Sequence, residues 1–226
     1  MIRAAIFDVD GTLVDSVDIH AKAWQDALRD FGHRIELADI RRQIGKGADQ
    51  LMPVFLSPEE LRARGHALEE HRGHLFRERY LSQIQPFPHV RELFERLRAD
   101  GIRIALASSG KEDEIRTHQQ RLHIEDLLDA QTTSDDAERS KPFPDIFQAA
   151  LARLPGVAAT EAVVVGDTPY DAQAAAGAGL RTIGVLCGGF PAAELREAGC
   201  IALYRDPQDL LQQYDQSVLA AGRQPG

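Results

Sequence analysis

Two aspartates directly follow the first apolar run of the chain. In the opening M-I-R-A-A-I-F-D-V-D-G-T, Asp8 and Asp10 stand one residue apart behind Ile6 and Phe7. An unpaired carboxylate taken out of water costs several kcal/mol or becomes protonated. We therefore expect both side chains at the end of a strand, where another group compensates their charge.

Further carboxylates follow a later apolar run, A-V-V-V-G-D-T-P-Y-D, which contains Asp167 and, four residues on, Asp171. Grouped with Asp8 and Asp10, these side chains would repel one another unless a hard cation lay among them. Magnesium prefers a few carboxylate oxygens, water and a substrate phosphate. If a helix begins after Asp167, Asp171 falls on the same face and can hold metal-bound water. The sequence therefore predicts a magnesium site formed by Asp8, Asp10, Asp167 and Asp171.

A phosphate site is predicted from two other stretches. The run I-R-I-A-L-A-S-S-G ends in Ser108 and Ser109, and S-K-P-F-P-D contains Lys141. Serine hydroxyls with neighbouring backbone N–H groups bind phosphate, and a lysine ammonium neutralises its charge. Ser109 also suits the N-cap of a helix over K-E-D-E-I, a role that can coexist with phosphate binding. We expect all three to hold substrate and Lys141 to stabilise the transferring oxygens as well.

The spacing of Asp8 and Asp10 suits covalent catalysis at phosphorus. A carboxylate near a phosphorus centre can attack it and form an aspartyl-phosphate. A second carboxylate can protonate the leaving group and then activate water. Asp8, next to the strand, suits the nucleophile, and Asp10, in the loop, suits the acid and base. Thr12 is expected to fix that loop by side-chain hydrogen bonds.

These residues need a sheet to bring them together. Helical patterns over 90–99, closed by Gly101, and over 145–154 alternate with continuous apolar runs. That alternation predicts an α/β fold with a doubly wound parallel sheet, in which ligands bind at the carboxyl ends of the strands. The strands are expected at residues 2–9, 102–107, 162–165, 182–186 and, more weakly, 201–204.

A helical insertion interrupts this alternation. Helical patterns cover 17–31 and 58–80, with no convincing strand between them, and the sheet is expected to resume near residues 86–88. The predicted organisation is a core domain of residues 1–14 and 82–226 and a small helical cap of residues 15–81.

Composition excludes several other classes of protein. The 226 residues are 43% hydrophobic and 27% charged with a formal net charge of -9, which disfavours binding to nucleic acid or an anionic membrane. The first residues do not form a signal peptide, and no apolar run is long enough for a membrane span. Cys187 and Cys200 have no C-x-x-C spacing and are expected to be reduced. We expect a cytoplasmic protein, with a disordered tail at residues 220–226.

Four stretches taken in order resemble the motifs of the haloacid dehalogenase-like (HAD) superfamily. They are D-V-D-G-T-L-V-D-S, A-L-A-S-S, S-K-P-F-P-D and G-D-T-P-Y-D, and they extend across essentially the whole chain. The resemblance implies Asp8 as nucleophile, Asp10 as acid and base, magnesium on Asp8, the Asp10 carbonyl and Asp167, and phosphate on Ser108 and Lys141. The helical insertion resembles the subgroup of phosphoglycolate phosphatases and β-phosphoglucomutases.

The cap is expected to set the choice of substrate. H-A-K-A-W, which begins at His20, resembles β-phosphoglucomutase caps, in which the histidine couples cap closure to the acid and base aspartate. Lys46, in I-G-K-G-A-D-Q, is a candidate substrate contact, although a plain turn residue is an alternative.

Three functions are compared. A phosphoglycolate phosphatase-like enzyme acting on a small phosphorylated metabolite is favoured, with Mg²⁺ as cofactor and a monomer or homodimer as the assembly. The alternative is a β-phosphoglucomutase-like phosphosugar mutase, but the cap loop lacks the arginine of that pattern and Gly166 replaces its acidic residue. A non-catalytic scaffold is disfavoured because the catalytic set is intact.

Overall fold

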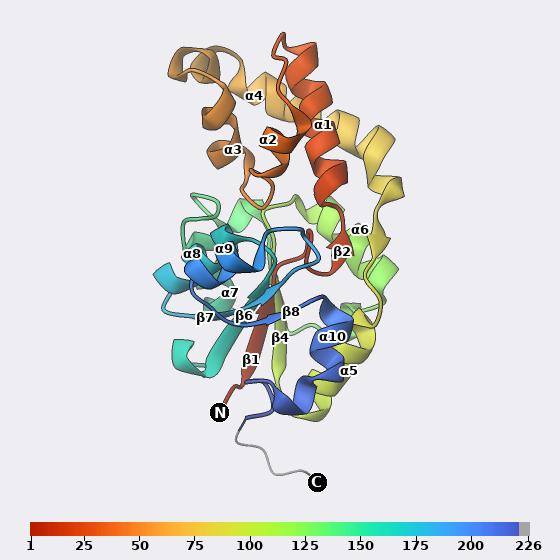
Figure 1. Ribbon diagram of the computed structural model, residues 1–226, viewed down its shortest axis with the longest axis vertical. Coiled ribbons are helices and arrows are strands. Elements are labelled where there is room, and N and C mark those ends of the chain that lie inside the picture. The colour runs from red at the N-terminus through yellow and green to blue at the C-terminus, as the bar shows by residue number, and fades with distance from the viewer. Residues whose placement is uncertain (222–226) are drawn as a thin grey trace.

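The computed structural model of the chain describes residues 1–221. Its centre is a six-stranded sheet in the order β5-β4-β1-β6-β7-β8, in which every neighbouring pair is parallel (Figure 1). The strands are β1 (Ala4–Phe7), β4 (Arg103–Ala107), β5 (Ala130–Thr132), β6 (Ala162–Gly166), β7 (Arg181–Val185) and β8 (Cys200–Tyr204). The predicted α/β fold with a parallel sheet is confirmed. The edge strand β5 was not predicted, because three residues are too few to give a pattern.

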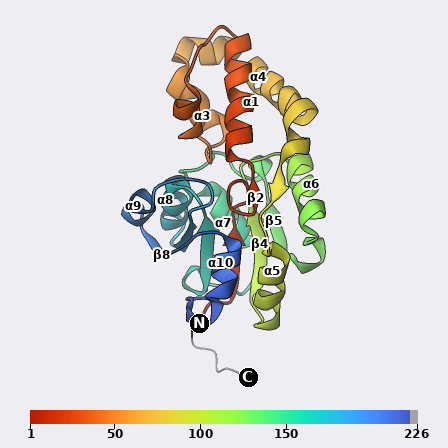
Figure 2. The same cartoon turned by 45° about the vertical axis from the view of Figure 1, so that its right-hand side comes forward.

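Helices cover both faces of this sheet, as the alternating side chains of β1 require. Ala5 and Phe7 pack into one hydrophobic cluster, while Ala4 and Ile6 pack into another on the opposite face. The first face is covered by α5 (Val90–Ala99), α6 (Glu112–Leu122) and α10 (Pro207–Gln212), the second by α7 (Asp145–Ala152) and α8 (Pro169–Gly177), and α9 (Ala192–Glu197) lies beside β8 (Figure 2). Because both faces are buried, the strands have continuous apolar sequences.

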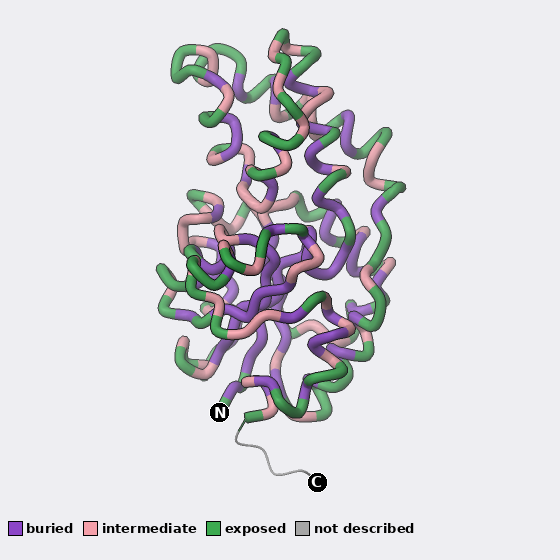
Figure 3. The backbone as a smooth tube through the Cα atoms, viewed as in Figure 1, coloured by how far each residue is buried: buried purple, intermediate pink, exposed green. Residues whose placement is uncertain are grey.

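Residues between β1 and α5 form a helical layer at one end of the sheet. Its helices are α1 (Val17–Asp30), α2 (Leu37–Arg41), α3 (Ala48–Phe55) and α4 (Pro58–Leu75), and α4 continues into a π-helical turn over Phe76–Tyr80. A capping box starts α4, since Ser57 Oγ accepts from Glu60 N and the Glu60 carboxylate accepts from Ser57 N. These helices have a hydrophobic cluster of their own, which includes Trp24, Leu28 and Leu68. Figure 3 shows buried segments of the backbone within this layer as well as in the sheet. A separate core supports our proposal that residues 15–81 are a cap domain.

The chain enters and leaves the cap through paired segments. β2 (Val14–Asp15) and β3 (Gln85–Pro86) form a two-stranded antiparallel pair, with Val14 opposite Pro86. The prediction that the sheet resumes near residues 86–88 is therefore wrong: Pro86 pairs with β2 outside the main sheet, which resumes only at β4. The pairing holds the two connections together next to Asp10.

Other expectations concern the surface and the tail. Within residues 1–221, no helix combines the length and apolar character that crossing a bilayer requires. Cys187 and Cys200 are both free thiols. Of the tail expected to be disordered, Ala220 packs against the main hydrophobic cluster, and residues 222–226 lie outside the described part of the chain.

Candidate active site

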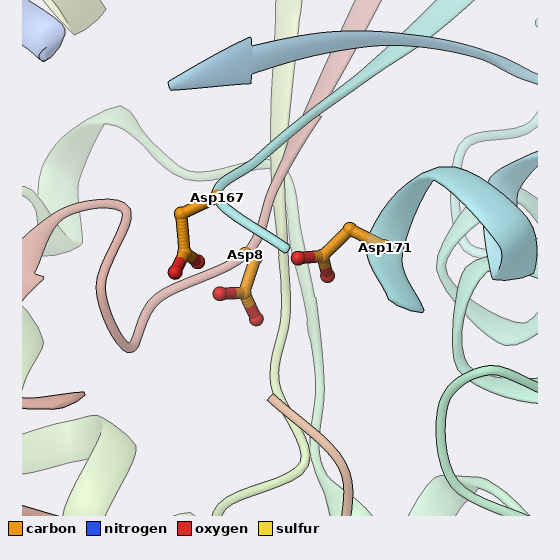
Figure 4. A group of neighbouring side chains, drawn as sticks. All are labelled: Asp8, Asp167 and Asp171. Carbon is orange, nitrogen blue, oxygen red and sulfur yellow. The ribbon is translucent and has the colours of Figure 1, made fainter. Parts of the chain in front are cut away.

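Three aspartates meet at the carboxyl ends of the central strands. Asp8 follows β1, Asp167 follows β6, and Asp171 lies in the first turn of α8 (Figure 4). Each offers a carboxylate oxygen, and these oxygens lie within 4.8 Å of one another. All three residues are at most 2% exposed. The neighbouring parallel strands β1 and β6 end at the same edge, which is why sequence-distant aspartates converge there.

Lys141 and Thr12 hold this cluster in place. Lys141 Nζ donates to Asp8 Oδ1 at 2.5 Å and to Asp171 Oδ1 at 2.8 Å, and the lysine is only 1% exposed. Thr12 Oγ1 lies 3.0 Å from Asp167 Oδ1 and 3.3 Å from Asp8 Oδ2. Each of these contacts restricts the rotation of a carboxylate, so Asp8 is held in one orientation.

Asp171 is engaged on both of its oxygens. Its Oδ2 accepts from Thr168 N at 3.0 Å and from Thr168 Oγ1 at 2.6 Å, and these bonds cap α8. Because Oδ1 accepts from Lys141, Asp171 fixes the position of the lysine ammonium. The predicted role in holding metal-bound water stays a proposal.

Negative charge exceeds positive charge in this cluster. Burial raises the pKa of Asp8 to about 7, with Lys141 acting against it and Asp171 and Asp10 adding to it. Burial also raises the pKa of Asp167 well above its usual range, and Asp171 and Asp8 raise it further. Although burial opposes the charge on Lys141, Asp171 and Asp8 hold its pKa above its usual value. One ammonium thus faces three carboxylates.

The residues present fit a divalent cation. Asp167 Oδ2 is buried and has no hydrogen-bond partner among the described residues. An unpartnered oxygen in a cluster with excess negative charge is an available ligand for a hard cation such as Mg²⁺. Asp8, the Asp10 carbonyl and Asp167 are the residues that we propose would hold it.

Two glycines allow the backbone to approach Asp167. Gly11 has φ +81°, and a Cβ built there would lie 2.5 Å from Asp167 Oδ2. A Cβ built at Gly188 would lie 1.7 Å from the same oxygen and 2.7 Å from the Asp167 Cβ. Any larger residue at either position must displace the carboxylate.

Gly188→Ala is therefore expected to weaken metal binding. The added methyl must push Asp167 aside, and we expect the magnesium concentration for half-maximal activity to rise at least about tenfold. Titration of activity with MgCl₂ measures this effect. Gly65→Ala, where the nearest atom to the new Cβ is 3.7 Å away, is the matched control and should leave the magnesium titration unchanged. An unchanged titration in Gly188→Ala would contradict the assignment of Asp167 as a ligand.

Asp10 lies at the boundary between the core and the cap. Its Oδ1 accepts from Ser16 Oγ at 2.7 Å and lies 2.8 Å from His20 Nε2 on α1. Burial raises the pKa of Asp10, but His20 and Ser16 together bring it well below its usual range. Both bonds use Oδ1, so Oδ2 takes part in neither.

Arg72 determines which nitrogen of His20 carries its proton. Arg72 Nη2, from the last turn of α4, contacts His20 Nδ1, and a guanidinium can only donate. His20 Nδ1 must therefore accept, which leaves Nε2–H to donate to Asp10. The His20 ring also stacks on Phe76 at 4.4 Å between centroids. Two cap helices thus fix the orientation of Asp10.

The predicted phosphate residues lie where β4 ends. Ser108 is buried and its Oγ accepts from Gly110 N at 3.0 Å. Ser109 Oγ is buried without a partner among the described residues, and Ser109 lines the main cavity. The N-cap of α6 is Lys111, so neither serine caps that helix. Lys141 approaches the same edge of the sheet from the other side.

A cavity of about 1010 Å³ lies between the sheet edge and the cap. Asp8, Asp10 and Lys141 line it from the core, and Trp24, Lys46 and Arg72 line it from the cap. Lys46 Nζ donates to Gln43 Oε1 at 2.6 Å and sits 4.6 Å from the centroid of the Tyr170 ring. Both predicted catalytic aspartates therefore open onto one space that the cap helps to enclose.

Comparison with known proteins identifies the family. The family model of the haloacid dehalogenase-like hydrolases matches residues 5–185. This chain is a haloacid dehalogenase-like hydrolase. The match extends from β1 to β7 and so includes all four sequence motifs.

Individual relatives of this hydrolase are similar over nearly their full lengths. A phosphorylated carbohydrates phosphatase of Thermotoga maritima is 29% identical, covering 93% of this chain and 97% of that protein. A phosphoglycolate phosphatase of Cereibacter sphaeroides is 31% identical, covering 91% and 96%. The crystal structure of a hydrolase from Pseudomonas syringae superposes with a TM-score of 0.84 at 32% identity, covering 94% of this chain and 98% of that one.

Several residues at the site of this hydrolase were not found from the sequence. Arg72 and Glu114 line the cavity, and Ser140 joins the cap to the core by accepting from Gly47 N at 2.9 Å and donating to Asp49 Oδ1 at 2.5 Å. His118 is buried in α6, where burial lowers its pKa. Ser140 lies in the S-K-P-F-P-D motif, but its contacts with the cap were not predicted. Arg72, Glu114 and His118 lie outside the four motifs, so no motif marked them.

Proposed function

We propose that this hydrolase is a magnesium-dependent phosphatase of small phosphomonoesters that works through an aspartyl-phosphate on Asp8. The observation that carries the proposal is the placement of Asp8, between Lys141 and Thr12, on a cavity that Asp10 also lines. The phosphatases among its relatives support the reaction class. The names of these relatives give different substrates. The proposal of a phosphoglycolate phosphatase-like enzyme therefore concerns the type of reaction and does not specify the substrate.

In the first step an Asp8 carboxylate oxygen attacks phosphorus and the bond to the leaving oxygen breaks. The leaving oxygen takes a proton from Asp10. The arriving phosphate brings negative charge next to Asp10, which raises its affinity for a proton. Since Ser16 and His20 occupy Oδ1, that proton would sit on Oδ2, and it goes from there to the leaving group.

In the second step Asp10 acts as the base. It is a carboxylate again after giving up its proton, and the bonds from Ser16 and His20 favour this form. It takes a proton from water, the water oxygen attacks phosphorus, and the bond to Asp8 breaks to release inorganic phosphate.

Lys141 is expected to bind the transferring oxygens as it binds Asp8 and Asp171 here. A magnesium ion bound by Asp8, the Asp10 carbonyl and Asp167 would supply further positive charge for the phosphate oxygens. Closure of the cap would exclude bulk water from the attacking carboxylate.

Asp10→Asn tests the two-step scheme. p-Nitrophenolate leaves without a proton, so the first step should continue, while release of phosphate from Asp8 should slow about 10²–10⁴-fold. We expect a burst of p-nitrophenol close to one equivalent of enzyme, followed by slow turnover, measured by stopped-flow absorbance. The exposed Asp15→Asn is the control and should turn over without a burst. Equal slowing of both phases would argue against a covalent intermediate.

The mutase alternative is less well supported. A mutase needs a cap residue for a second phosphate, but Lys46 is engaged by Gln43 and Tyr170, and burial lowers its pKa. A Cβ at Gly166 would lie 2.6 Å from Asp171 Cγ, so an acidic side chain does not fit there while Asp171 holds Lys141. Turnover of β-glucose 1-phosphate that depends on a bisphosphate activator would favour the mutase.

Two further expectations stay predictions. A cytoplasmic location can be checked by cell fractionation, and a monomer or homodimer by size-exclusion chromatography with light scattering.

A further inference from the structure

Glu114 is a buried carboxylate that the proposed mechanism does not use. It lies in the first turn of α6, is 4% exposed and lines the cavity. Burial raises the pKa of its carboxyl, while Arg72 and His20 act against that rise and Asp10 adds to it. Glu114 is therefore close to the group that would protonate the leaving oxygen. Glu114 also lines the same cavity as Asp8.

Arg72 faces Glu114 from the cap. Glu114 is the charge that most strongly supports the protonated guanidinium, ahead of Asp10. The guanidinium lies 4.6 Å from the centroid of the Phe76 ring and 5.4 Å from that of Trp24, so aromatic rings fix its plane. One of its nitrogens contacts His20, and its Nε is buried without a hydrogen-bond partner among the described residues.

The two charged side chains do not satisfy each other. Within residues 1–221, no ion pair or hydrogen bond joins Arg72 to Glu114, and no side-chain hydrogen bond of Glu114 is present. A carboxylate that lines the cavity without a hydrogen bond, and a buried guanidinium nitrogen without a partner in the wall of the same cavity, can both bond to one bound group. That group must donate to Glu114 and accept from Arg72.

Two serine hydroxyls in the cavity wall also lack hydrogen-bond partners among the described residues. Ser109 Oγ and Ser134 Oγ are both buried without a partner among the described residues, and both residues line the cavity. A serine hydroxyl can donate or accept, so it can complete a network around a ligand hydroxyl. The core side of the cavity thus has unused hydrogen-bonding capacity.

We propose that Glu114 and Arg72 select a leaving group that carries a free hydroxyl, as in a phosphorylated sugar or polyol, and reject one that carries a carboxylate. The inference rests on the proposed phosphatase function. A hydroxyl donates to Glu114 and accepts from Arg72 at the same time. A carboxylate can accept from Arg72 but cannot donate, and it would meet the charge of Glu114 in a buried space.

A matched pair of substrates tests this selectivity. 2-Phosphoglycolate and 2-hydroxyethyl phosphate differ only in whether a carboxylate or a CH₂OH group lies next to the phosphoester carbon. We expect the wild-type kcat/KM to be at least about 30-fold higher for 2-hydroxyethyl phosphate. Glu114→Gln keeps the shape and removes the charge, and it should lower that ratio at least about tenfold. The inhibition constant of 2-phosphoglycolate should fall in the same variant.

Two further variants separate charge from packing. Glu114→Asp keeps the charge and should still reject 2-phosphoglycolate. Glu112→Gln, two residues earlier on α6 and exposed, is the same chemical change outside the cavity and should leave the ratio unchanged. Circular dichroism melting checks that each variant is folded.

A wild-type preference for 2-phosphoglycolate would overturn the proposal, as would a ratio that Glu114→Gln leaves within about twofold of wild type. If no substrate released phosphate, p-nitrophenyl phosphate included, the phosphatase function itself would fail, and the selectivity with it. If p-nitrophenyl phosphate were hydrolysed but 2-phosphoglycolate were preferred over 2-hydroxyethyl phosphate, the proposed selectivity would be overturned and the phosphatase function would stand.

Discussion

Asp8→Asn is expected to abolish phosphate release. An amide oxygen is a far weaker nucleophile at phosphorus than a carboxylate, and the other two carboxylates of the cluster do not line the cavity that Asp8 lines. Asp171 is bonded to Lys141 and Thr168, and Asp167 lies against Thr12 and Gly188. We expect a loss of at least about 10⁴-fold in kcat, measured as phosphate released from p-nitrophenyl phosphate with saturating MgCl₂.

The shape of the site should survive this substitution. Asn is isosteric with Asp, its oxygen can still accept from Lys141, and its NH₂ group can donate to Thr12 Oγ1 instead of accepting from it, so loss of activity would reflect chemistry rather than misfolding. The exposed Asp15→Asn is the control and should keep wild-type turnover. More than about a tenth of the wild-type rate in Asp8→Asn would exclude Asp8 as the nucleophile. A biological role that persisted in the inactive variant would favour a scaffold function.

The sequence predicted the core part of the site because that part depends on strand ends. Asp8, Ser108 and Asp167 each follow a continuous apolar run. In a parallel sheet the ends of neighbouring strands lie side by side, so their positions along the chain were enough to predict that these residues converge. The strands that carry them are β1, β4 and β6, which are adjacent in the sheet.

The cap side of the site could not be predicted in the same way. Arg72 contacts His20, which lies 52 residues earlier, and it faces Glu114 on a core helix. The first contact depends on how α1 and α4 pack within the cap, and the second on the angle at which the cap packs on the core. No local periodicity encodes either arrangement. Asp171 shows a related difficulty. Its spacing from Asp167 predicted that the two carboxylates lie close together, but only the packed structure shows both oxygens of Asp171 engaged by Lys141 and Thr168.

Metal-free protein is expected to lose stability as the pH rises from about 4 to 7. The pKa of Asp8 is about 7 in the folded protein, against an ordinary value of 3.8. Between these values the folded state binds more protons than the unfolded state, so the free energy of unfolding falls as the pH increases. The pKa values of Asp167 and Glu114 are also raised, and they act in the same direction. His118 acts in the opposite direction, since burial lowers its pKa and the unfolded state gains its proton below the usual value of 6.5.

The pKa of Asp10 does not change this expectation. It lies below the usual value, so Asp10 contributes stability that is lost only as the pH falls below about 4. The pKa of Lys141 is raised above 10.5, so its contribution is constant over this range. Urea unfolding in EDTA should therefore give a free energy of unfolding on the order of 3 kcal/mol lower at pH 8 than at pH 5.

Magnesium and Asp8→Asn should each remove most of this pH dependence, for different reasons. Magnesium binds the ionised carboxylates of the folded state, so it stabilises the protein most at pH 8, where protons no longer compete. Asp8→Asn removes the group that titrates, so its metal-free stability should vary much less with pH. In EDTA at pH 8 the variant should also be more stable than wild type, because one of three mutually repelling buried carboxylates is gone. Two results would contradict the assignment of Asp8 as the group whose ionisation destabilises the folded protein. One is a metal-free wild type that is more stable at pH 8 than at pH 5. The other is an Asp8→Asn variant whose stability changes with pH as much as that of the wild type.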